Sequence, residues 1–145
     1  MTPPPLSFVT PAGFAPPKGY AYGAVTRGPL LHVGGQVGWD PATGRFASDD
    51  FVQQLAQCLD NVLAVVTAAG GRPTDIARMT VYVTDLDAYR TRLREIGAVW
   101  KARLGRHYPA MALVGVAGLV EPEARVEIEA VAVLPEAPVS AGDPP

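Results

Sequence analysis

Two carboxylates near the end of the chain, Glu127 and Glu129, are the side chains best suited to acid–base chemistry. They alternate with apolar residues over 125–134, and this period predicts a strand. One face of that strand would carry Val126, Ile128, Ala130 and Ala132, and the other would carry the two carboxylates with Val131 and Val133. A carboxylate in such apolar surroundings is a candidate general acid or base. Cross-strand ion pairs with Arg78 or Arg125 are the alternative explanation.

The other reactive side chains give weaker signals. His32 and His107 are the only histidines, and no second ligand lies close to either in the sequence, so we expect no metal site. Cys58, the only cysteine, falls on the apolar stripe of a predicted helix, where we expect it to pack as a small hydrophobic residue. Gly34-Gly35 is not followed by the Lys-Ser/Thr pair of a phosphate loop, so we expect close backbone packing there.

The elements that must position these residues follow from the spacing of apolar side chains. Runs of β-type residues flank Gly28-Pro29, a strong turn signal, and therefore predict a hairpin. Apolar residues spaced by three and four predict two helices, and strict alternation predicts the remaining strands. In chain order the expected elements are strands 20–27 and 30–37, a helix over 50–69, a strand over 78–84, a helix over 86–104, and strands 110–116 and 125–134.

The order β-β-α-β-α-β-β predicts an α+β domain with one mixed sheet. Each helix is apolar on one side only, so we expect both helices to pack on the same face of the sheet. No third helix is predicted to cover the other face, which is the face of Glu127. We therefore expect self-association into a closed ring of subunits, which would bring Glu127 near residues of a neighbour.

Composition narrows the class of protein. The chain has 145 residues, 48% of them hydrophobic and 18% charged, which is typical of one globular domain. We expect that domain over 20–135, after an N-terminal segment 1–19 and before a disordered tail 136–145. A net charge of -2 without a run of basic residues argues against nucleic acid as a partner. The lone cysteine and the absence of a long apolar stretch favour a cytoplasmic protein that does not enter membranes.

Several segments, taken together in this order and spacing, resemble the RidA/YjgF family of reactive-intermediate (enamine/imine) deaminases. The resemblance covers nearly all of 20–134, and the Val126-Glu127-Ile128-Glu129-Ala130 ending is its most specific part. The segments that carry it are Leu31-His32-Val33-Gly34-Gly35-Gln36-Val37, Asp40-Pro41-Ala42-Thr43-Gly44, 75–85, Tyr108-Pro109-Ala110 and 126–132.

This resemblance implies a chorismate-mutase-like (YjgF) fold and a homotrimer whose sites lie in clefts between subunits. It also implies hydrolysis of small enamines or imines, such as 2-aminoacrylate, to a keto acid and ammonia without a cofactor. Glu127 matches the family's acidic residue, which orients the hydrolytic water, and Gly35 matches the glycine whose backbone lines the pocket. Tyr22, Trp39 and Tyr108 are candidates for the pocket walls, as aromatic residues are in this family's clefts, or else for the subunit interface. His107 stands before the expected site strand and is a further candidate for lining the cleft.

One position departs from the family pattern. Met111 occupies the place of the arginine that holds the substrate carboxylate, and a thioether cannot form a bidentate clamp. The segment between Met111 and Glu127 is also one residue longer than in typical deaminating members. Two hypotheses follow: a divergent deaminase in which Arg106 or a neighbour's arginine replaces the anchor, and a trimer that binds a small metabolite without catalysis. RNA cleavage is a third, which the acidic charge disfavours.

Overall fold

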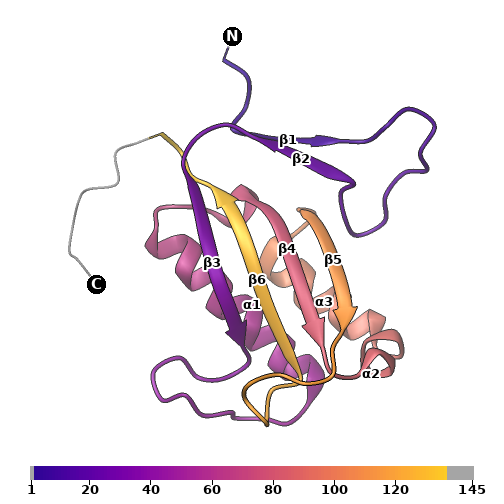
Figure 1. Ribbon diagram of the computed structural model, residues 1–145, viewed down its shortest axis with the longest axis vertical. Coiled ribbons are helices and arrows are strands. Elements are labelled where there is room, and N and C mark those ends of the chain that lie inside the picture. The colour runs from indigo at the N-terminus through magenta and orange to yellow at the C-terminus, as the bar shows by residue number, and fades with distance from the viewer. Residues whose placement is uncertain (1, 137–145) are drawn as a thin grey trace.

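A mixed four-stranded sheet forms the centre of the computed structural model, which describes residues 2–136 (Figure 1). Its strands are β3 (Leu30–Val37), β6 (Val126–Val133), β4 (Ile76–Val83) and β5 (Ala110–Gly115), in that spatial order. β6 is antiparallel to both of its neighbours, whereas β4 and β5 are parallel. The strand of the two carboxylates therefore lies inside the sheet, between β3 and β4.

Helices cover one face of this sheet, behind the strands in Figure 1. α1 (Phe51–Ala68) packs on β3 and β6, and α3 (Leu93–Leu104) lies beside α1. A 3₁₀ turn, η1 (Pro73–Asp75), precedes β4. The core contains the apolar stripes that the periodicity predicted, including Cys58 and Val62 of α1 with Met79 and Ile128 of the sheet. The predicted α+β architecture with helices on one face is confirmed.

The second predicted helix is interrupted. A short helix, α2 (Leu86–Arg90), ends at Thr91, and α3 begins only after Arg92. The backbone of Arg92 leaves the helical region, and its guanidinium pairs with Asp50 of the other helix and with Glu95. Apolar periodicity continued across this break, because a partner that is distant in sequence leaves no mark on the local pattern.

The predicted hairpin between 20–27 and 30–37 is wrong. β2 (Gly23–Thr26) pairs instead with β1 (Leu6–Val9) in a separate two-stranded antiparallel sheet, while β3 joins β6. Gly28 redirects the chain between the two sheets at a φ of 125°, a conformation that favours glycine. The Gly-Pro signal located a change of direction correctly, but it could not show which strand each run would pair with.

The domain limits stay predictions. The N-terminal segment 1–19 contains β1, and most of the expected tail 136–145 lies outside the described residues. Within 2–136, no helix has both the length and the apolar character needed to cross a membrane.

Candidate functional site

Glu127 and Gly35 lie against each other on the face of the sheet that the helices leave open. Val126 and Ile128, on either side of Glu127, belong to the core, so the Glu127 side chain points away from the helices. A Cβ placed on Gly35 would lie 2.1 Å from Oε1 of Glu127. The register of β3 against β6 shifts between Val33 and Gln36, which is where this close approach occurs. The half-buried carboxylate therefore rests on a stretch of backbone that has no side chain.

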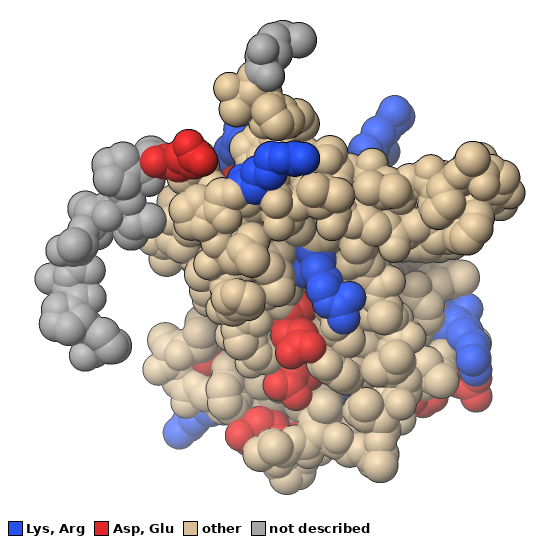
Figure 2. Space-filling model, turned by 45° about the horizontal axis from the view of Figure 1, so that its top comes forward, with Lys and Arg blue, Asp and Glu red and all other residues tan. Residues whose placement is uncertain are grey.

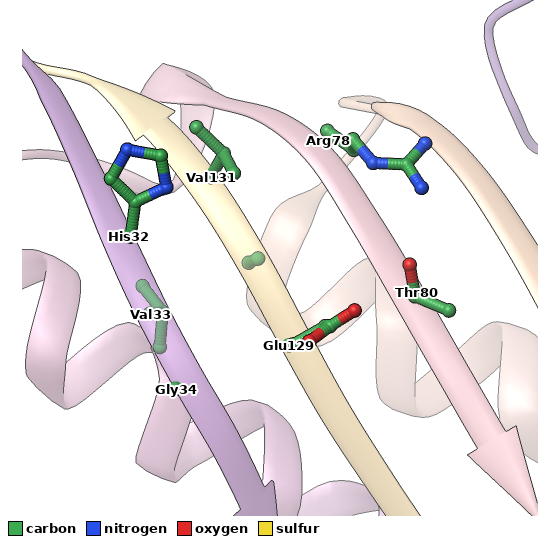
Figure 3. Close-up of a pocket in the computed structure, with 8 residues that line it drawn as sticks. His32, Val33, Gly34, Arg78, Thr80, Glu129 and Val131 are labelled. Atoms are coloured by element: carbon green, nitrogen blue, oxygen red, sulfur yellow. The ribbon is translucent and has the colours of Figure 1, made fainter.

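A hollow of about 350 Å³ lies along the same face, lined by residues of β3, β4 and β6 (Figure 3). His32, Arg78, Thr80 and Glu129 supply its polar groups. Glu129 accepts a hydrogen bond of 2.7 Å from the hydroxyl of Tyr82, and this bond raises the pKa of Tyr82 because it favours the protonated phenol. Basic and acidic side chains lie in line near the middle of a mostly uncharged surface in Figure 2.

The alternative explanation of the carboxylates was cross-strand ion pairing. Neither Glu127 nor Glu129 takes part in the ion pairs found among residues 2–136. Arg125 instead donates its backbone N–H to Gln54 and its side-chain Nε–H to the carbonyl oxygen of Asp49. Ion pairing therefore does not explain the two carboxylates within the part of the chain that the structure describes.

Met111 lies on the opposite face. It pairs in register with Met79 of β4, a fully buried core residue, and it packs against the core itself. Beside it is a pocket of about 380 Å³ between β5 and α3, walled by aromatic and aliphatic side chains. Its lining includes Tyr20, Tyr89, Trp100, Tyr108, Met111 and Leu113. The rings of Trp100 and Tyr108 stack with centroids 6.1 Å apart and planes 6° from parallel.

One chain does not bring Met111 and Glu127 together. Tyr82 is the register partner of Glu127 on β4, and Tyr82 alternates with Val81 and Val83, which face the core. Glu127 thus projects from the open face, and Met111 projects from the helix-covered face. A site that uses both positions needs one of them from a second subunit.

Tyr22, Trp39 and His107 are not among the residues that line the Met111 pocket. Tyr22 donates its hydroxyl to a carbonyl seven residues earlier in the same loop. The ring of Trp39 lies 6.0 Å from that of Phe46. His107 places Nε2 2.7 Å from the carbonyl oxygen of Ile76. Of the candidates for the pocket walls, only Tyr108 lines the pocket beside Met111.

Sequence reasoning missed Tyr20, Tyr89, Trp100 and Leu113 as pocket residues. Strand alternation could have identified Leu113, because it follows Met111 by two and shares its face. Trp100 lies on the apolar stripe of α3, and this stripe is only partly covered by the core: Ile96 is buried while Leu93 remains 55% exposed. No local signal distinguished Tyr20 from Tyr22.

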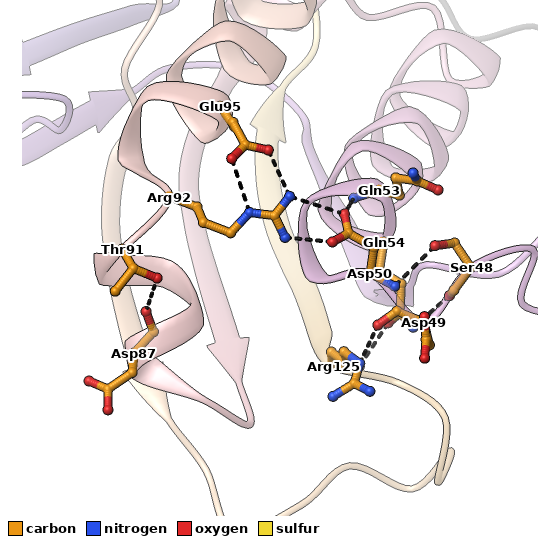
Figure 4. A network of polar contacts seen from close by, with 10 residues as sticks. All are labelled: Ser48, Asp49, Asp50, Gln53, Gln54, Asp87, Thr91, Arg92, Glu95 and Arg125. Atoms are coloured by element: carbon orange, nitrogen blue, oxygen red, sulfur yellow. Dashed lines mark hydrogen bonds and ion pairs between the residues drawn. The ribbon is translucent and has the colours of Figure 1, made fainter.

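A polar network fastens α1 to α3 and to the loop before β6 (Figure 4). Asp50 caps α1 by accepting from the backbone N–H of Gln53, and it also receives the guanidinium of Arg92 at 2.5 Å. These bonds, the one from Arg92 first, lower the pKa of the Asp50 carboxyl. Arg92 also binds Glu95 at 2.7 Å and lowers the pKa of that carboxyl. The network holds in place the helix that forms one wall of the Met111 pocket.

Buried Gln54 links the loops before α1 and β6 through hydrogen bonds. Its side chain is 1% exposed, and its amide donates to the carbonyl oxygens of Ser48 and Glu123 at 3.0 and 2.9 Å. Its carbonyl oxygen accepts the backbone N–H of Arg125 at 2.8 Å. Three backbone groups from two loops are therefore satisfied by one buried side chain.

The described residues offer neither a metal-binding cluster nor a reactive thiol. Within residues 2–136, no cluster of three or more His, Cys, Asp or Glu side chains is arranged to hold a metal ion. Cys58 is fully buried, and burial, followed by the negative charge of Glu127, raises the pKa of its thiol well above the usual range. A thiol in this state is a core residue and not a nucleophile at neutral pH.

Comparison with known proteins gives consistent matches. A family model described as endoribonuclease L-PSP matches residues 11–134. The chain is 38% identical over 126 residues to the 2-iminobutanoate/2-iminopropanoate deaminase of Salmonella typhimurium, covering 85% of this chain and 91% of that protein. It is 41% identical over 108 residues to the RutC family protein y4sK of Sinorhizobium fredii, covering 74% and 82%.

Solved structures agree in fold. The Rid family protein YyfB of Yersinia pestis, whose function is unknown, superposes with a TM-score of 0.79 at 29% identity over 90% of this chain and 99% of that one. Escherichia coli TdcF with bound serine superposes with a TM-score of 0.63 at 36% identity, over 85% and 91%.

Proposed function

The chain belongs to the RidA/YjgF family, whose model is described as endoribonuclease L-PSP, and from this membership we propose that it deaminates a small enamine or imine in a cleft between subunits. The observation that carries the proposal is the Glu127 carboxylate, which rests on Gly35 on the open face of the sheet. A 38% identical relative is named as a deaminase of 2-iminobutanoate and 2-iminopropanoate, and this supports the reaction class.

Hydrolysis of an imine requires the protein to position a water molecule and to transfer protons. Water adds to the carbon of the C=N bond, a proton moves to nitrogen, and the carbinolamine collapses to a carbonyl compound and ammonia. Glu127 would orient the water, accept its proton and pass that proton to the imine nitrogen. It would then take the hydroxyl proton of the carbinolamine and deliver it to the nitrogen as the C–N bond breaks. Gly35 would leave room for the carboxylate and for the substrate, because any side chain there would occupy the carboxylate's position.

Met111 makes this a divergent member in our proposal. An arginine at this position would provide a planar cation with paired donors for a carboxylate, and methionine provides neither charge nor donor. Arg106 does not line the pocket beside Met111, whose charged lining residue is Lys18. Lys18 or an arginine of a neighbouring subunit would therefore be the replacement anchor.

We also propose that the functional unit is a homotrimer. The open face of the sheet carries Glu127 and Val131 without helices over it, and Met111 lies on the far side of the same sheet. A neighbour's Met111 pocket placed near Glu127 would complete the site and cover the open face. Light scattering of the purified protein should give about 46 kDa, three times the chain mass of 15.2 kDa; a mass of one chain would contradict the shared site.

The test of the activity is a coupled assay. A dehydratase releases 2-aminoacrylate from serine, and the added rate of pyruvate formation is followed for wild type, Glu127→Gln, Glu129→Gln and Met111→Arg. We expect Glu127→Gln to abolish the acceleration, and Glu129→Gln serves as the matched change two residues along the same strand face. Restoration or increase of activity by Met111→Arg would show an intact cleft with an altered anchor. Equal rates in wild type and Glu127→Gln would refute the catalytic role.

A non-catalytic metabolite-binding trimer is the second candidate. The observation that favours it is the apolar Met111 pocket, which retains no arginine among its lining residues. Silence of both wild type and Met111→Arg in the assay, together with measurable binding of a small organic ligand, would support this function. The RNA cleavage named in the family description is not part of the proposal, because a net charge of -2 provides no field to hold phosphates.

A cytoplasmic location belongs to the proposal as well. The lone Cys58 is buried and serves as a core residue, which suits a compartment where thiols stay reduced. Cell fractionation with a marker enzyme tests this, and recovery of the protein outside the cytoplasm would refute it.

A further inference from the structure

The pocket beside Met111 has the walls of a site for a flat apolar group. Trp100 and Tyr108 present one stacked pair of rings, and Tyr20 and Tyr89 add two further aromatic faces. Met111 is unbranched and polarisable, so it can adapt to the edge of a ring. A volume of about 380 Å³ falls within the range of small-molecule sites, which are mostly apolar with a few polar groups.

The charged group of this pocket is an exposed lysine. Lys18, on the exposed loop next to Gly19, is the charged side chain among the described lining residues. A single ammonium group at the rim suits a ligand with one carboxylate at its outer end. A three- or four-carbon imino acid would satisfy Lys18 but would leave the aromatic walls in contact with water.

The pocket beside Met111 extends to the backbone of α3 at Gly97. Gly97 of α3 lines the pocket, and a Cβ added there would meet no atom within 4 Å. Glycine inside a helix lowers the stability of the helix relative to alanine. A glycine at this helical position therefore widens the pocket at a cost to the helix.

We propose that this pocket takes the bulky apolar group of an imino acid, above all an aromatic ring, and that Lys18 holds its carboxylate. The proposal rests on the proposed function and names its substrate class: imines of phenylalanine- or leucine-like amino acids in place of 2-aminoacrylate. The ring lies against Trp100 and Tyr108, and Met111 is then a specificity determinant and not merely a lost anchor.

Calorimetric titration with three stable probes tests the binding half. 3-Phenylpropionate should bind at least about tenfold more tightly than propionate, because only the former buries a ring. Lys18→Ala should weaken 3-phenylpropionate but leave 3-phenylpropionamide unchanged. Gly97→Phe should fill the pocket and abolish binding of both phenyl probes, whereas Ala98→Phe, at the next position of the same helix and outside the pocket lining, should not. Equal binding of propionate and 3-phenylpropionate, or no effect of Gly97→Phe, would overturn the proposal.

Turnover separates this proposal from the proposed function. An amino acid oxidase generates the imino acids of phenylalanine, leucine and alanine in place, and keto-acid release is followed with and without the protein. We expect larger acceleration with the phenylalanine and leucine products. Acceleration restricted to the alanine product would overturn the substrate class and leave the deaminase intact. Phenyl binding that depends on Gly97, without any turnover, would support the pocket and refute the deaminase.

Discussion

Replacing Gly35 with alanine tests the geometry at Glu127 directly. The added methyl group would lie 2.1 Å from Oε1 and 2.9 Å from the carboxyl carbon of Glu127, far inside ordinary contact distance. The obstructing atoms belong to the end of a flexible side chain and not to backbone. The fold should therefore absorb the change by moving the carboxylate rather than by shifting a strand.

The size of that movement sets the expected loss. Ordinary contact begins near 3.4 Å, so Oε1 must move by about 1.3 Å from its present position. Displacing a catalytic group by about 1 Å costs on the order of a hundredfold in rate. We expect kcat/KM for imine hydrolysis to fall by about that factor in Gly35→Ala, with little change in the free energy of unfolding.

Gly34→Ala is the matched control, because a Cβ at Gly34 would meet no atom within 4 Å. Both variants add one methyl group to adjacent positions of β3, so any general effect on the strand is shared. The assay compares the rates of wild type, both variants and Glu127→Gln under the same coupling conditions. If Gly35→Ala keeps the rate of Gly34→Ala, the Glu127 carboxylate does not act from the position that the structure shows.

Three further predictions concern stability and reactivity. Gln54→Leu should lower the free energy of unfolding, measured by urea titration, by about 2 to 4 kcal/mol because buried backbone groups lose their hydrogen-bond partner. The control Gln53→Leu, at an exposed position, should change the free energy of unfolding by less than about 0.5 kcal/mol. Asp50→Asn retains a helix cap but loses the charge that Arg92 binds. The pKa of Asp50 in the folded protein is lower than its ordinary value of 3.8, so the charged carboxylate stabilises the folded state above pH 3.8. The difference in stability between wild type and Asp50→Asn should therefore vanish as the pH falls through the lowered pKa. A stability difference that stays constant in melting curves recorded across this pH range would contradict the prediction. Cys58 should react with a thiol reagent only as fast as the protein unfolds, and rapid labelling of the native protein would contradict its burial.

Local periodicity was enough to predict most of the helices and strands and the class of fold, but it missed β1 and the break between α2 and α3. The alternation around Met79 and Ile128 and the helical stripe through Cys58 placed the correct side chains in the core, because burial of one face imposes a period that any window of the sequence reveals. The motif from Val126 to Ala130 indicated the family that the match over residues 11–134 then confirmed, whereas the departure from the family pattern at Met111 stays a prediction.

Pairing and juxtaposition were decided by tertiary structure alone. The partner of β2 proved to be β1, and the helix break at Arg92 coincides with an ion pair to Asp50, the N-cap of α1, which is 42 residues away. Periodicity reports which way a side chain faces within its own element, but it carries no information on what lies opposite. For the same reason the sequence could name Glu127 and Met111 only as candidate site positions, and the register of β4 with β5 and β6 was needed to place them on opposite faces of one sheet.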